Sequence, residues 1–72
     1  MNAFAEAILS SPVREVIGTE ISYLSPKTKR KRIGDIVSVS GSGTKVLNRD
    51  GIHEFVTFRD FTGIKTQLKT QR

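Results

Sequence analysis

The 72-residue chain contains no cysteine and no tryptophan, and it has a single histidine and a single tyrosine. The absence of cysteine excludes disulfide bonds, thiolate metal sites and thiol catalysis. The one histidine, His53, cannot form a two-histidine metal site, and the acidic residues show no metal-ligand spacing. We therefore predict no metal and no other cofactor, and we expect His53 to face solvent.

Long hydrophobic runs are also missing. The apolar stretch at the N-terminus is short and carries Glu6 but no basic residue, unlike a signal peptide, and no segment is long enough to span a bilayer. We therefore expect a soluble cytoplasmic protein without a membrane partner. The length predicts one small domain over residues 1–72, close to the lower limit at which a hydrophobic core alone supports a fold.

Positive charge is plentiful and unevenly placed. The formal net charge is +5, from 12 Lys and Arg against 7 Asp and Glu. Residues 1–26 have a balance of −2, whereas residues 27–72 have a balance of +7. This asymmetry favours a polyanionic partner, which could be DNA, RNA or an acidic protein surface.

Hydrophobic periodicity predicts an N-terminal helix over residues 2–10, in which Phe4 and Ile8 share one face. Pro12 ends this helix and could open one further helical turn before Gly18. From there the apolar residues recur with period two, which is typical of strands. Five strands are predicted, at about residues 19–24, 32–40, 44–48, 52–58 and 63–68, followed by a frayed tail over 69–72.

One helix followed by five short consecutive strands predicts a mainly β fold (α+β by element count). The apolar face of the second strand switches at Gly34 and Asp35, which indicates a β-bulge or sharp bend. A single helical turn is expected over residues 59–61. We therefore expect a strongly bent antiparallel sheet that closes into a small Sm-like or Src-homology-3-like barrel, because closure removes exposed strand edges.

The connection between the first two predicted strands holds most of the excess charge. Five of the six residues from 27 to 32 are cationic: Lys27, Lys29, Arg30, Lys31 and Arg32. Lys and Arg neutralise phosphates without reading bases, so the run predicts contact with a DNA or RNA backbone. The alternatives are a solvated turn without a ligand, a nuclear-import signal and an anionic-membrane patch.

Aromatic residues could extend such a site by stacking on bases. Tyr23 lies on the strand that leads into the basic run, and its hydroxyl favours a partly exposed position. It is therefore a candidate for base stacking, with packing at the edge of the core as the alternative. Phe55, Phe58 and Phe61 are expected in the core, because a small barrel needs its large apolar residues inside.

Arg59 is the remaining candidate, because it lies where the chain leaves the fourth strand and its charged head can reach an anion. The alternative is an ion pair with Asp60, Asp35 or Glu54. The acidic residues fall on turns and strand ends, and the chain has no matched acid–base pair. We therefore do not expect an enzyme.

Three segments together resemble the WYL domain, a small Sm-like barrel of bacterial regulators. They are residues 21–26, residues 46–47 and residues 57–64, which match an I-x-Y strand before a turn and a terminal segment similar to F-R-L-D-R-I. The resemblance covers about residues 8–64, but of the Trp-Tyr-Leu signature only Leu47 is retained. It implies a barrel that holds a nucleotide or nucleic acid, with Arg59 matching a ligand-contacting arginine.

These observations predict a non-enzymatic nucleic-acid-binding module, a small regulatory protein of a bacterium or phage. One alternative is an accessory protein of phage or mobile-element type that binds and modulates another protein, such as transcription machinery. A further alternative is self-association into a homo-oligomer through the edges of the sheet.

Overall fold

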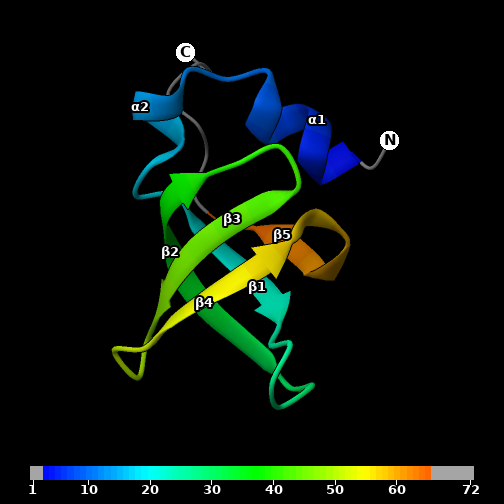
Figure 1. The fold of residues 1–72 in the computed structure, drawn as a ribbon, viewed down its shortest axis with the longest axis vertical. Coiled ribbons are helices and arrows are strands. Elements are labelled where there is room, and N and C mark those ends of the chain that lie inside the picture. The colour runs from blue at the N-terminus through cyan, green and yellow to red at the C-terminus, as the bar shows by residue number, and fades with distance from the viewer. Residues whose placement is uncertain (1–2, 66–72) are drawn as a thin grey trace.

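The computed structural model describes residues 3–65 (Figure 1). Two short helices precede five strands and a 3-10 turn: α1 (Ala3–Leu9), α2 (Val13–Val16), β1 (Glu20–Leu24), β2 (Lys31–Val39), β3 (Gly43–Asn48), β4 (His53–Thr57), η1 (Phe58–Asp60) and β5 (Phe61–Ile64). None of the helices within residues 3–65 has the length and apolar character needed to cross a membrane.

The five strands form one antiparallel sheet in the order β4-β3-β2-β1-β5. Figure 1 shows the sheet bent so strongly that β1 and β2 cross behind β3 and β4. The predicted mainly β fold, with five antiparallel strands and a short N-terminal helix, is confirmed. Among the described residues, no ladder joins the two edge strands β4 and β5, so closure into a barrel stays a prediction.

Most predicted elements lie within a residue or two of their observed bounds. The helical turn after Pro12 is present as α2, and the second turn begins one residue earlier than expected, at Phe58. The closing strand begins at Phe61 rather than at residue 63, because Phe61 already pairs with Tyr23 of β1. The remainder of that predicted strand, residues 66–68, and the tail lie outside the described residues.

One face of the bent sheet and the helix α1 enclose the core. Its buried side chains are Ala5, Ile8, Val16, Ile21, Tyr23, Ile36, Val46, Val56, Phe58 and Phe61. The helix is anchored by Phe4, whose ring centroid lies 6.0 Å from that of Phe61, and Phe61 in turn lies 5.5 Å from Phe58. These contacts place α1 over the η1–β5 end of the sheet.

The second strand passes very close to the third at Gly34. A Cβ atom there would lie 2.4 Å from Cγ1 of Val46 and 2.8 Å from the carbonyl oxygen of Leu47, so only glycine fits. The irregularity in pairing falls farther along β2, between Ile36 and Ser38, and not at Gly34 and Asp35, where the sequence suggested it. The sheet therefore bends at a bulge that follows the glycine.

Candidate functional site

The basic run (residues 27–32) begins in the connection between β1 and β2 and continues into β2. Lys27, Lys29, Arg30 and Lys31 are exposed, whereas Arg32 is half-buried. Arg32 forms an ion pair with Asp50, but within residues 3–65 the other four cations form no ion pair. Their charge is therefore available to a ligand.

Hydrogen bonds to Ser25 set the backbone conformation of the connection. The Ser25 N–H donates to the Arg30 carbonyl at 2.9 Å, and the Lys29 N–H donates to the Ser25 carbonyl at 2.8 Å. The Ser25 hydroxyl oxygen accepts from the N–H groups of Lys27 at 3.3 Å and Thr28 at 3.4 Å. Lys29 adopts a left-handed φ of 62°. The basic run is thus presented on an ordered turn that is built around one serine.

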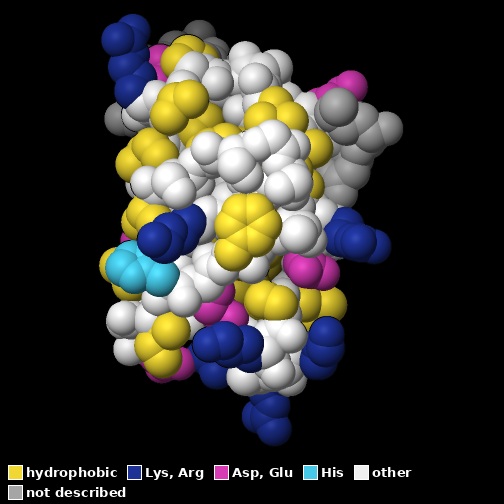
Figure 2. Space-filling view, in the orientation of Figure 1, with side chains coloured by type: hydrophobic (Ala, Val, Ile, Leu, Met, Phe, Trp, Pro, Cys, Tyr) yellow, Lys and Arg dark blue, Asp and Glu magenta, His cyan; other side chains and the backbone are white. Residues whose placement is uncertain are grey.

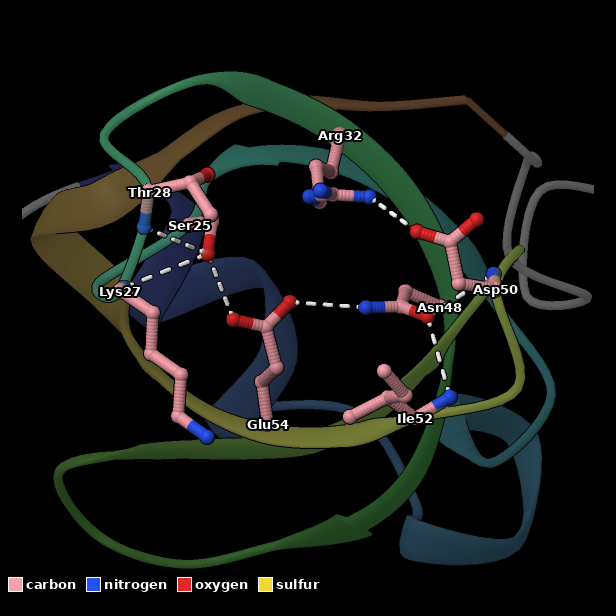
Figure 3. Close-up of a pocket in the computed structure, with 8 residues that line it drawn as sticks. All are labelled: Ser25, Lys27, Thr28, Arg32, Asn48, Asp50, Ile52 and Glu54. Atoms are coloured by element: carbon pink, nitrogen blue, oxygen red, sulfur yellow. Dashed lines mark hydrogen bonds and ion pairs between the residues drawn. The ribbon is translucent and has the colours of Figure 1, made fainter.

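Ser25 is held in turn by the carboxylate of Glu54, which is only 7% exposed (Figure 3). The Ser25 hydroxyl donates to Oε1 at 2.6 Å. The Tyr23 hydroxyl and the Asn48 amide both donate to Oε2 at 2.9 Å. One buried side chain on β4 thereby joins β1, β3 and the connection that carries the basic run.

Side chains along β4 alternate between the two faces of the sheet, and this alternation places Glu54 in the interior. His53 and Phe55 are exposed, whereas Glu54 and Val56 are buried. In register, Glu54 lies opposite the buried Val46 of β3. Glu54 was expected to be one of several acids scattered over turns and strand ends, and its buried position was not predicted. The available signal was an acid in the otherwise apolar alternation of Ile52, Val56 and Phe58.

Asn48, the last residue of β3, completes the network. Its side-chain oxygen accepts from the N–H groups of Asp50 at 2.9 Å and Ile52 at 3.1 Å, which shapes the turn between β3 and β4. Its amide nitrogen donates to Glu54. The same carboxylate therefore stabilises both turns at this end of the sheet, as Figure 3 shows.

The network fixes the protonation of its two titratable members. Burial raises the pKa of Glu54, but the hydrogen bonds from Ser25, Asn48 and Tyr23 outweigh it, so the pKa lies below its ordinary value. Burial and the bond to the Glu54 carboxylate raise the pKa of Tyr23 to about 12. At neutral pH the carboxylate is therefore charged and the tyrosine keeps its proton.

Acid is expected to weaken the fold through Glu54. Because the folded pKa is depressed, its contribution is complete above the unfolded pKa and is lost as the pH falls through the folded value. Glu54→Gln should cost about 1–3 kcal/mol at pH 7, since a donor would replace one acceptor oxygen. Urea unfolding from pH 7 to pH 2 should show this difference from wild type shrinking towards acid. Parallel stability curves for the two proteins would contradict the assignment.

A pocket of about 100 Å³ opens at this end of the sheet (Figure 3). Its lining residues come from both turns and the neighbouring strands: Ser25, Lys27, Thr28, Arg32, Asn48, Asp50, Ile52 and Glu54. Two cations and two anions therefore meet here, and the inward-facing polar groups largely satisfy one another. The hydrogen bonds around the pocket hold the turn that carries the basic run.

A second hollow, of about 220 Å³, has a different character. It is lined by Ser22, Lys31, Arg32, Ile33 and Lys65. Three of these residues are cations and none is an acid. Because Arg32 is paired with Asp50, Lys31 and Lys65 supply the positive charge that would favour an anion here. Lys65, which follows β5, was not among the predicted site residues. It joins the basic run because β1 separates β5 from β2 by a single strand.

For two aromatic residues the burial is the reverse of the prediction. Tyr23 was expected to be partly exposed, but its side chain is 0% exposed, because the acceptor for its hydroxyl lies inside the fold. Its ring therefore has no free face for a base. Phe55 was expected in the core but is 49% exposed, because Glu54 and Val56 occupy the inner face of β4. Phe58 and Phe61 are buried, as predicted.

Arg59 lies exposed on η1, an element separate from the basic run. Within the described part of the chain it forms no ion pair with the three expected acids. Asp60 accepts from the Thr57 hydroxyl at 3.1 Å, and Asp35 pairs with Arg49 at 3.3 Å. The guanidinium of Arg59 is thus free to contact an anion.

A scan of protein-family models finds no match to this chain. Searches of curated proteins and of solved structures likewise find no significant similarity.

Proposed function

We propose that this protein is a non-enzymatic nucleic-acid-binding module that contacts phosphates through the basic run. The observation that carries the proposal is four exposed cations without an ion pair in the described structure, next to a hollow lined by Lys31, Arg32 and Lys65. Like charges on Lys31 and Lys65 repel each other, and an anion bound between them would lower that repulsion. A polyphosphate backbone supplies such anions at regular spacing.

The order of the turn supports binding further. Side chains on a turn already held by Ser25 and Glu54 lose less conformational entropy on binding than side chains on a flexible loop. Phosphate contact alone carries no sequence information, so the basic run would bind DNA or RNA without base preference. Arg59 would add a secondary phosphate contact from η1, as the WYL resemblance also implies.

Closure of the sheet into a barrel is part of the same proposal. A closed Sm-like or Src-homology-3-like barrel requires β4 and β5 to meet, and the three-residue η1 connects these two strands directly. The inner faces of all the strands supply one core, which is compatible with closure. On this view the protein is a small regulatory module of WYL type, acting in the cytoplasm of a bacterium or of a phage host.

A charge reversal in the basic run tests the proposal. Arg30→Glu is expected to weaken binding to a labelled oligonucleotide about tenfold at low salt, and to flatten the dependence of log K on log salt by about 0.8. Wild-type binding should have a slope of about −3 if all four exposed cations contact phosphates of a single strand. Fluorescence anisotropy at several salt concentrations measures both quantities.

Arg14→Glu on α2 is the matched control, because Arg14 is also exposed and either variant lowers the formal net charge from +5 to +3. The control should retain wild-type affinity within about twofold. If both variants weaken binding equally, only overall charge matters and the proposed site is wrong. If the wild-type protein binds no oligonucleotide at low salt, the function itself is wrong. An acidic protein partner would then be sought by pull-down from nuclease-treated lysate.

A further inference from the structure

The outer surface of β3 and β4 carries an aromatic ring that is not part of the hydrophobic core. Phe55 is 49% exposed although it lies in the middle of β4, because the strand's alternation turns it away from the core. Figure 2 shows hydrophobic side chains in the middle of the face on which β3 and β4 lie, with Lys or Arg and His side chains beside them. An exposed ring on the outer face of a sheet is a surface that a ligand can cover.

The neighbours of Phe55 on this face include a lysine, a histidine and a glycine. Lys45 lies directly opposite it on β3, and the exposed His53 lies two residues away on the same face of β4. A Cβ atom at Gly43 would lie 3.0 Å from Cζ of Phe55, so the ring leans across β3 over this glycine. The ring therefore lies along the sheet, and half of Phe55 stays exposed next to its register partner Lys45.

We propose that Phe55 is the base-stacking residue of this protein and that its ligand is single-stranded nucleic acid. This inference rests on the proposed function and deepens it. An aromatic ring beside a lysine matches one nucleotide, with the base on the ring and the phosphate near the cation. In a duplex the bases stack on one another, so only an unstacked base can cover Phe55.

The stacking position lies within reach of the basic run. Phe55 directly follows Glu54, whose carboxylate contacts the hydroxyl of Ser25 at 2.6 Å. One glutamate side chain thus separates the backbone of β4 from the turn that presents Lys27, Lys29 and Arg30. The Phe55 ring points to the outer face of the same strand, and β4 is an edge strand, so a nucleic-acid strand can pass round it from the turn to the ring. A strand of a few nucleotides can place one base on Phe55 and its neighbouring phosphates on the turn. The stacking site predicted at Tyr23 of β1 is thereby replaced by one on the edge strand β4.

Phe55→Ala is expected to lower the affinity for a single-stranded oligonucleotide of about twelve nucleotides roughly tenfold, while duplex affinity stays within about twofold. The salt dependence should not change, because no charge is removed. Val13→Ala is the control, since Val13 is also exposed, at 61%, but lies on α2. The control should bind like wild type. An equal loss for both polymers, or no loss for either, would overturn the inference.

Phe55→Trp supplies an independent readout, because the chain has no other tryptophan. Its affinity should equal that of wild type, and its fluorescence should be quenched by a single strand but not by a duplex. Unchanged fluorescence on saturation with a single strand would overturn the inference. If wild type binds with a steep salt dependence and Phe55→Ala binds equally well, only the stacking role is overturned. No binding by wild type at low salt would overturn the proposed function and the inference together.

Discussion

Replacing Tyr23 with alanine is expected to leave the protein largely unfolded at room temperature. Tyr23 is the largest of the fully buried side chains, and removing an aromatic side chain from a core costs about 3–5 kcal/mol. The change also removes one donor from the buried Glu54 carboxylate, which adds about 1–3 kcal/mol. At about 0.05–0.15 kcal/mol per residue, a chain of this length has only about 4–11 kcal/mol of stability. Circular dichroism and urea unfolding measure the result.

Tyr23→Phe separates the two contributions, because it keeps the ring and removes only the hydroxyl. We expect it to fold and to lose about 1–3 kcal/mol in urea unfolding. Its stability should remain dependent on Glu54, since Ser25 and Asn48 still donate to the carboxylate. A folded Tyr23→Ala protein within about 1 kcal/mol of wild type would show that Tyr23 is not a central residue of the core.

Gly43→Ala is expected to destabilise the protein by about 3 kcal/mol, at the upper end of the usual cost of overpacking. The added Cβ would lie 2.4 Å from the carbonyl oxygen of Val56 and 2.8 Å from Cα of Thr57. Both are backbone atoms, so no side-chain rotation relieves the clash. The β3–β4 ladder would have to open at the pair formed by Gly43 and Thr57. Thermal and urea unfolding measure the loss.

Gly41→Ala is the matched control two residues away. No atom lies within 4 Å of a Cβ at this position, and its φ is not in the left-handed region. We expect this variant to have wild-type stability or to gain about 0.4–1 kcal/mol from a less flexible unfolded chain. Equal stability of the two alanine variants would mean that β3 and β4 approach each other less closely at Gly43 than the structure indicates.

The elements of the fold could be predicted because they depend on neighbours along the chain. Apolar spacing in residues 2–10 indicated the helix, and period-two alternation indicated the strands. Residues that end helices, such as Pro12 and Gly18, marked the boundaries of the helical segments. The position of the basic run after the first strand followed from the same reasoning. In the structure residues 27–30 lie in the connection, and Lys31 and Arg32 are the first two residues of β2.

The composition of the site could not be predicted in the same way. Glu54 is separated from Tyr23 by 31 residues and from Ser25 by 29, and nothing local brings them together. Their contact depends on the pairing of β1 with β2, β2 with β3 and β3 with β4. The same pairing decided that Tyr23 is inside and Phe55 outside, because residues opposite each other in a ladder share a face of the sheet.

The amino-acid sequence by itself determined the strand pattern, the excess positive charge and its place between two strands, since these follow from residue types and their local order. Only the tertiary structure decided which cations stay without an ion pair, which aromatic ring stays exposed, and which acid is buried to hold the turn. These properties depend on strands distant in sequence lying side by side. A buried charge is stable only where the fold supplies its hydrogen-bond donors, as Ser25, Tyr23 and Asn48 do for Glu54.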